Sequence, residues 1–94
     1  MPSPIESLSI AKEIFEMRNE QYGAAYQKAG AIMAALFPDG VTLKTESDFA
    51  RYNHLTQCIG KLNRYSANLT TGGHIDSALD LINYAAMLVE ATND

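Results

Sequence analysis

Apolar residues recur every three or four positions along nearly the whole chain, and this spacing restricts the possible folds more than any other feature. It places apolar side chains on one face of an α-helix, which has about 3.6 residues per turn. A half-buried β-strand would show alternating apolar and polar residues rich in β-branched types, and no segment has that pattern. The sequence therefore predicts an all-α protein.

Breaks in the pattern separate the expected helices in the N-terminal half. We expect the first helix to be capped by Ser7 or Ser9 and to weaken at Gly23, which either kinks one long helix or separates two. The alanine-rich residues 24–37 favour helix. A proline and two turn residues at 38–40 then stop it.

The C-terminal half contains two further expected helices. Residues 45–48 offer an N-cap with an acidic residue three positions on, a weaker form of the capping box. Residues 67–73 form a flexible link, and the last helix begins near His74. Its apolar arc is wide enough for burial on two sides, against sister helices or a second subunit. The arc consists of Ile75, Leu79, Ile82, Ala86 and Val89, with Leu81, Ala85 and Leu88 beside them.

The length of 94 residues limits the chain to one domain, expected over residues 1–94 with its core over 8–90. Short connections predict a compact bundle of three to four antiparallel helices. Ordering such a chain costs on the order of 140 kcal/mol, at roughly 1.5 kcal/mol per residue, so its own core leaves a thin margin of stability. We therefore expect a homo-oligomer.

The charge balance restricts the partners. Seven Lys and Arg residues against eleven Asp and Glu residues give a net charge of −4. This charge argues against duplex-DNA binding and against binding to an anionic membrane surface through bulk charge. Any anionic ligand must therefore be held by a local site.

Cysteine usage and the N-terminus indicate a cytosolic protein. Cys58 is the single cysteine, so no intrachain disulfide forms, and no Cys/His cluster has the spacing of a structural zinc site. Residues 1–6 lack the basic and apolar regions of a signal peptide. No run of 18 apolar residues could span a bilayer.

Two basic and two acidic residues fall at matching positions in the last two expected helices. In an antiparallel pair Arg64 faces Asp76, and Lys61 and Asp80 lie about 4.5 and 6 Å further along at about 1.5 Å per residue. One interpretation is a pair of salt bridges that fix the helix register, each contributing about 0–1 kcal/mol. The other interpretation is a polar ligand pocket.

Three features favour the ligand pocket. Asp76 and Asp80 are like charges four residues apart and attract a cation. Gly72 and Gly73 lead into a helix N-terminus, where unpaired N–H groups suit a phosphate. His54 extends the polar stripe and offers a hydrogen-bond partner for a base or a sugar.

The first expected helix carries Glu13, Glu16 and Glu20 on one face. Carboxylates at this spacing can hold Mg²⁺ when another helix adds an acid, and the alternative is a solvated acidic face. Tyr22 is either a half-buried core residue or a base-stacking platform. His74 is most simply an N-cap or a loop residue.

Three short motifs occur in a fixed order along the chain. They are R-x-x-x-Y-G at residues 18–23, K-L-x-R at residues 61–64 and D-S-x-x-D-x-x-x-Y at residues 76–84, accompanied by His54 and His74. Their order and spacing resemble the small phage and prophage nucleotide-modification-associated proteins. The resemblance covers about residues 11–90.

This resemblance implies an all-α, phage-encoded protein that handles nucleotides and is related in style to the MazG-like nucleotide pyrophosphohydrolases. That group builds its Mg²⁺ site from E-E-x-x-E and E-x-x-D elements. The chain has only Glu13-x-x-Glu16 as a partial match to the first, and Asp76-x-x-x-Asp80 departs in spacing from the second.

The leading hypothesis is a nucleotide-binding protein, with Mg²⁺-dependent pyrophosphohydrolysis of a nucleoside triphosphate as its catalytic form. The alternatives are a non-catalytic counter-defence protein that sequesters a host nucleotide signal and a protein-interaction module. The expected nucleotide-binding residues are Arg18, Tyr22, His54, Lys61, Arg64, Gly73 and His74, and the expected magnesium ligands are Asp76, Asp80, Glu16 and Glu20.

Overall fold

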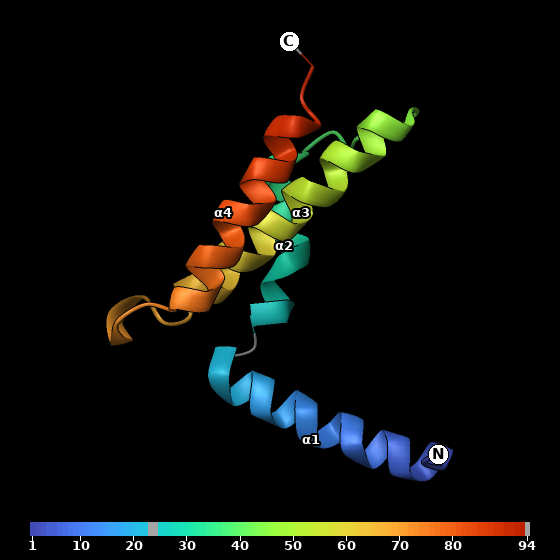
Figure 1. Cartoon of the computed structure of the whole chain (residues 1–94), viewed down its shortest axis with the longest axis vertical. Coiled ribbons are helices and arrows are strands. Elements are labelled where there is room, and N and C mark those ends of the chain that lie inside the picture. The colour runs from blue at the N-terminus through green and yellow to red at the C-terminus, as the bar shows by residue number, and fades with distance from the viewer. Residues whose placement is uncertain (23–24, 94) are drawn as a thin grey trace.

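Every regular element that the computed structural model describes, over residues 1–22 and 25–93, is a helix (Figure 1). The predicted all-α class is therefore confirmed. The weak point expected at Gly23 lies outside the described residues. In chain order the elements are α1 (Pro4–Tyr22), the 3₁₀ turn η1 (Ala25–Lys28), α2 (Ala29–Leu36), α3 (Glu46–Ser66), the 3₁₀ turn η2 (Leu69–Thr71) and α4 (Ile75–Glu90).

Helix α1 begins earlier than the sequence predicts. The Ser3 hydroxyl accepts a hydrogen bond from the N–H of Glu6 at 3.2 Å. Pro4 is the first helical residue, where its missing N–H is not needed. The predicted cap at Ser7 or Ser9 is therefore wrong, because both serines lie inside the helix.

The predicted stop after the alanine-rich stretch is confirmed. Helix α2 ends at Leu36, and the N–H of Phe37 still donates to the carbonyl of Met33 at 2.9 Å. Gly40 follows at φ +80°, a left-handed conformation that favours glycine. The chain therefore turns sharply between α2 and the start of α3.

The predicted cap of α3 is confirmed as a full capping box. Thr45 accepts a hydrogen bond from the N–H of Asp48 at 3.0 Å. The Asp48 carboxylate accepts hydrogen bonds from the N–H groups of Lys44 at 3.1 Å and Thr45 at 3.2 Å. These two hydrogen bonds, with smaller help from the Thr45 hydroxyl and Arg51, hold the pKa of Asp48 below its ordinary value.

Helices α3 and α4 form an antiparallel hairpin, and most of the contacts between elements lie within it (Figure 1). Cys58 of α3 and Ser77 of α4 are buried. At the far end, the Arg51 guanidinium donates to the carbonyl of Ala91 at 3.1 Å. Cys58 is therefore part of the small core of the hairpin.

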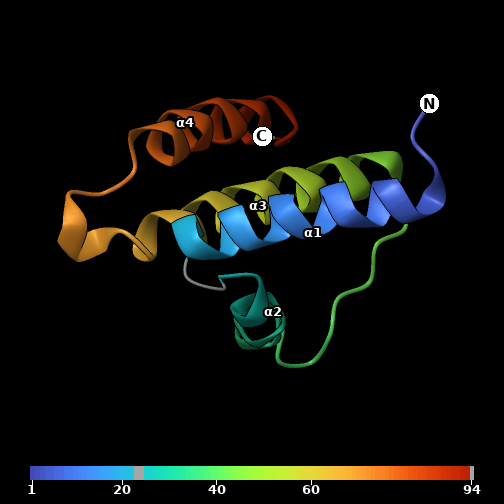
Figure 2. The same ribbon diagram turned by 90° about the horizontal axis from the view of Figure 1, so that it is seen from below.

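Helix α3 lies between α4 on one side and α2 on the other (Figure 2). Phe37, just after α2, packs against Tyr52 of α3 with ring centroids 6.2 Å apart. The Asn63 amide donates to the carbonyl of Ala25 at 2.7 Å and fixes η1 against α3. These contacts hold the middle of the chain on the hairpin.

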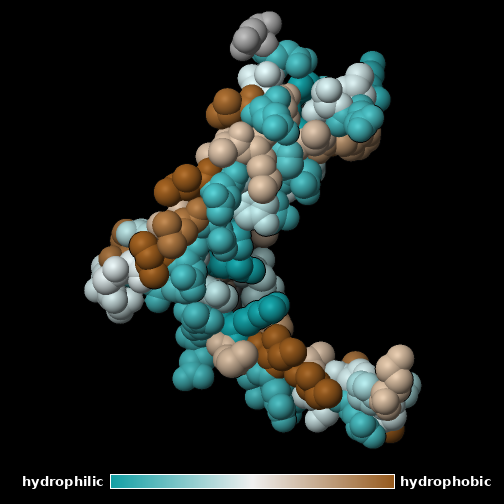
Figure 3. All heavy atoms as spheres, in the orientation of Figure 1, coloured by the Kyte–Doolittle hydropathy of each residue, from teal (hydrophilic) through white to brown (hydrophobic). Residues whose placement is uncertain are grey.

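Helix α1 leaves the hairpin at a wide angle and contacts the rest of the structure through its C-terminal half (Figures 1 and 3). The radius of gyration is 16.2 Å, whereas a compact domain of this length has about 12 Å. The four helices therefore form a more open arrangement than the compact bundle that the sequence predicts.

Candidate functional site

One of the two predicted ion pairs is present. Lys61 Nζ lies 3.3 Å from the Asp80 carboxylate, and the Lys61 side chain is 14% exposed against 50% for Asp80. Lys61 Nζ also lies 5.8 Å from the centroid of the Tyr84 ring. Lys61 is therefore neutralised within the hairpin, as the register interpretation predicts.

The second predicted pair is replaced by a different contact. The Arg64 guanidinium lies over the ring of Tyr22 from α1, 5.0 Å from its centroid. Asp76 is exposed in the first turn of α4, and over the described residues it forms no ion pair. Lys61, Arg64, Asp76 and Asp80 therefore do not share one cavity. The prediction is corrected because the aromatic face of α1 attracts Arg64.

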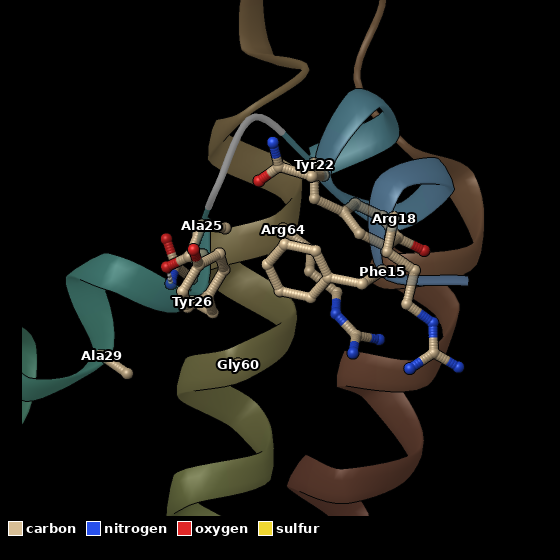
Figure 4. A pocket seen from close by; sticks show the side chains of 10 residues that line it. Phe15, Arg18, Tyr22, Ala25, Tyr26, Ala29, Gly60 and Arg64 are labelled. Atoms are coloured by element: carbon tan, nitrogen blue, oxygen red, sulfur yellow. Dashed lines mark hydrogen bonds between the residues drawn. The ribbon is translucent and has the colours of Figure 1, made fainter. Parts of the chain in front are cut away.

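Arg64 instead lines a cavity of about 330 Å³ between the C-terminal half of α1, η1, the start of α2 and the last turns of α3 (Figure 4). We call this cavity the two-arginine pocket. Its lining residues are Phe15, Arg18, Asn19, Tyr22, Ala25, Tyr26, Ala29, Gly60, Asn63 and Arg64.

The two-arginine pocket takes its positive charge from two separate helices. Arg18 comes from α1 and Arg64 from α3, and both guanidinium groups extend toward the same side of the pocket (Figure 4). Across residues 1–22 and 25–93, neither arginine forms an ion pair with a carboxylate. Both charges are therefore available to an anionic ligand.

Aromatic rings form much of the remaining wall. Phe15 packs edge-on against Tyr26 with ring centroids 5.3 Å apart. Tyr22 is half-buried, with Arg64 over its face. Flat apolar surface beside two guanidinium groups suits a ligand with a planar part and an anionic part.

His74 supports the pocket from outside rather than lining it. Its Nδ1 accepts a hydrogen bond from the N–H of Ser77 at 3.2 Å, so of the two expected roles, N-cap or loop residue, His74 takes the N-cap of α4. Its Nε2 lies 3.5 Å from the side-chain amide nitrogen of Gln21. The ring also packs edge-on against Tyr22 with centroids 5.5 Å apart. His74 therefore couples the end of α1 to the start of α4.

The glycine pair before α4 has a steric role. Gly73 adopts φ +81°, and a Cβ at this position would lie 2.6 Å from the hydroxyl oxygen of Tyr65. Gly72 adopts φ +103°. The helix start that follows is capped by His74. The glycines therefore form the turn and admit the Tyr65 ring, and Gly73 does not line the two-arginine pocket.

The expected magnesium ligands are not brought together. Glu13, Glu16 and Glu20 are exposed on α1, where Glu16 lies 3.8 Å from Lys12. Asp76 and Asp80 lie on α4. Over the described part of the chain, no three His, Cys, Asp or Glu residues gather to hold a metal ion. These residues do not fit a magnesium site within one chain over the described residues.

His54 lies outside the two-arginine pocket. Its Nδ1 is buried and has no hydrogen-bond partner over residues 1–22 and 25–93. It is therefore not placed to contact a nucleoside there.

Sequence reasoning missed part of the pocket wall. Arg18, Tyr22 and Arg64 were expected at a binding site, but Phe15, Asn19 and Tyr26 were not singled out as site residues. The signal in the sequence is the spacing of residues 15, 18, 19 and 22, which lie on one side of a helix. The contribution of Asn63 depends on how η1 packs and has no local signal.

No family model, curated protein or solved structure matches this chain. The resemblance to phage nucleotide-modification-associated proteins therefore stays a prediction. Of the described helices, none combines the length and the apolar character needed to cross a membrane.

Proposed function

We propose that this protein binds a nucleotide in the two-arginine pocket. The observation that carries the proposal is the meeting of Arg18 and Arg64, both free of ion pairs across the described residues, beside an aromatic wall. Of the residues that the sequence singled out for nucleotide binding, Arg18, Tyr22 and Arg64 line this pocket. Lys61, His54, Gly73 and His74 do not.

The guanidinium groups supply the phosphate-binding chemistry. A guanidinium presents donors in a planar fork that matches two phosphate oxygens at once. The chain as a whole carries a net charge of −4 and would repel an anion elsewhere. Binding therefore depends on these two side chains.

The aromatic wall supplies the base-binding surface. Phe15 and Tyr26 are exposed and offer flat apolar area for a purine or pyrimidine, whereas one face of Tyr22 is covered by Arg64. Asn19 adds an amide that can pair with the polar edge of a base. The volume of about 330 Å³ falls at the lower end of small-molecule sites, roughly 300–1,000 Å³, and suits a mononucleotide.

Binding through arginines needs no metal ion, so the proposal stands without the predicted magnesium. Hydrolysis and dependence on Mg²⁺ stay predictions from the family resemblance. The same is true of sequestration of a host nucleotide signal.

Thermal-shift measurements test the proposal directly. The full chain is heated with ribo- and deoxyribonucleoside mono-, di- and triphosphates, with and without Mg²⁺. We expect at least one nucleotide to raise Tm by an amount that grows with its concentration relative to Kd. Absence of any shift across the panel, together with absence of heat in calorimetric titration, would contradict nucleotide binding.

A matched pair of variants on α1 locates the site. Arg18→Gln removes one charge-assisted hydrogen bond of about 1.5–3 kcal/mol and should weaken nucleotide affinity about 10- to 100-fold. Lys12→Gln removes the same charge from the same helix but lies outside the pocket, and its affinity should stay unchanged. Equal weakening by both variants would show bulk charge rather than a site.

The fate of the bound nucleotide decides between binding and catalysis. After incubation with and without Mg²⁺, the protein is denatured and the nucleotide is separated by chromatography. Recovery of unaltered nucleotide supports a binding or sequestering protein. Release of pyrophosphate supports the hydrolytic alternative.

A further inference from the structure

Helix α1 exposes its apolar side chains to solvent. Every residue of α1 from Pro4 to Gln21 is exposed, and Leu8 is 71% exposed. An isolated helix of this length is marginally stable in water, because its stability normally comes from packing of an apolar face. The other large apolar residues exposed on α1 are Ile5, Ile10, Ile14, Phe15 and Met17.

The chain as a whole has too little buried surface for a stable monomer. It exposes 7230 Å², whereas a compact monomer of 10.3 kDa exposes about 5,400 Å². Across the described residues, only Ala25, Cys58 and Ser77 are buried. The excess of about 1,800 Å² means that the core is incomplete within one chain.

A groove that fits a helix lies between α2 and α3. Its volume is about 510 Å³ and its surface is almost wholly apolar. From Leu55 to Ser66 it follows α3 for about 16 Å at about 1.5 Å per residue. The apolar flank of α1 is a wide arc of about 180° that runs from Leu8 at one edge to Met17 at the other, with Ile14 between them, and it is about 14 Å long. The lining residues are Lys28, Ile32, Leu36, Leu55, Ile59, Leu62, Asn63 and Ser66.

We propose that the protein is a homodimer in which α1 of each copy places its apolar flank in the α2–α3 groove of the other. Each chain carries both an unpartnered helix and an unfilled groove. A dimer with two-fold symmetry therefore covers both helices and fills both grooves. The proposal does not depend on nucleotide binding.

The area and the charges favour a second copy of this chain. A dimer that buries the excess exposed surface of both copies has an interface of about 3,600 Å², within the roughly 2,000–5,000 Å² of obligate dimers. Helix α1 carries four glutamates against two basic residues. The groove carries Lys28 and no acidic residue. The net negative charge of α1 therefore favours its approach to this groove.

Sedimentation equilibrium of the full chain over a wide range of concentration tests the proposal. We expect twice the chain mass of 10.3 kDa and a Tm that rises with protein concentration. A single chain mass at every concentration, with a constant Tm, would overturn it.

Two variants one residue apart test the role of α1. Leu8→Glu puts a charge on the apolar flank and should abolish the dimer, although the new glutamate lies four residues before Lys12, which favours the helix itself. Ser9→Glu puts the same charge on the polar face, four residues before Glu13, and should stay dimeric. If the two variants acted only through charge interactions within α1, Ser9→Glu would weaken the dimer more than Leu8→Glu.

Unfolding of Leu8→Glu also supports the dimer if Ser9→Glu remains folded, because a side chain 71% exposed in one chain cannot hold a monomer together. Leu62→Glu in the groove should act as Leu8→Glu does, whereas Leu79→Glu on the outer face of α4 should remain dimeric. A dimer that survives Leu8→Glu and is lost in Leu79→Glu would overturn the assignment.

Discussion

Gly73→Ala should destabilise the protein more than Gly72→Ala, although the two residues are adjacent in one turn. Both glycines have positive φ, at +81° for Gly73 and +103° for Gly72. A left-handed conformation costs a residue with a Cβ about 1–2 kcal/mol. This backbone cost is common to both variants.

The two positions differ in what the added Cβ meets. At Gly72 no heavy atom lies within 4 Å. At Gly73 the Cβ would lie 2.6 Å from the Tyr65 hydroxyl oxygen and 2.9 Å from Cζ. Overpacking costs about 1–3 kcal/mol, and Tyr65, which is 37% exposed, can rotate outward. We therefore expect about 1 kcal/mol of extra destabilisation in Gly73→Ala.

Urea unfolding at one fixed protein concentration measures this difference. Gly73→Ala should lower the midpoint further than Gly72→Ala without changing the m value. In a Tyr65→Ala background the two variants should become equal, because the ring that opposes the Cβ is gone. Equal midpoints in the Tyr65 protein, or a difference that persists in the Tyr65→Ala background, would refute the steric argument.

Three further perturbations are predicted from the described contacts. Asp80→Ala should lower the free energy of unfolding by about 1 kcal/mol more than Asp76→Ala, because it leaves Lys61 largely buried without its partner; urea unfolding compares them. The pKa of Asp48 is lowered in the folded protein, so its stabilising effect is complete above pH 3.8 and is lost as the pH falls further. Asp48→Asn should reduce stability at neutral pH. When urea midpoints are measured at a series of pH values, the midpoint of this variant should fall less steeply at acid pH. His74→Ala should cost about 0.5–2 kcal/mol in the same assay through loss of the α4 cap.

The register of the hairpin could be predicted from sequence. An antiparallel pair with a short link fixes the level of each residue along the helix axis, since each residue advances by about 1.5 Å. Lys61 and Asp80 therefore meet as expected. Arg64 does not meet Asp76, because its orientation also depends on Tyr22 of a third helix.

The two-arginine pocket could be predicted only in part. Arg18, Tyr22 and Arg64 belong to motifs that the sequence shows. Their convergence depends on how the end of α1 meets the end of α3, which is set by aromatic and histidine contacts between distant segments. The expected magnesium ligands share helix faces on α1 and α4, but over the described residues no three of them gather where these helices meet.

The sequence by itself determined the helical class, the stop after α2 and the cap of α3, and it offered His74 as one candidate cap of α4. These features depend on hydrogen bonds and backbone angles within three or four residues, so the local residue types suffice. Tertiary structure alone decided which side chains line the pocket and how far α1 stands from the hairpin. Those outcomes depend on how whole helices rotate and cross. Successive side chains point about 100° apart around a helix, so the rotation of the helix decides which of them meets a partner and which faces water.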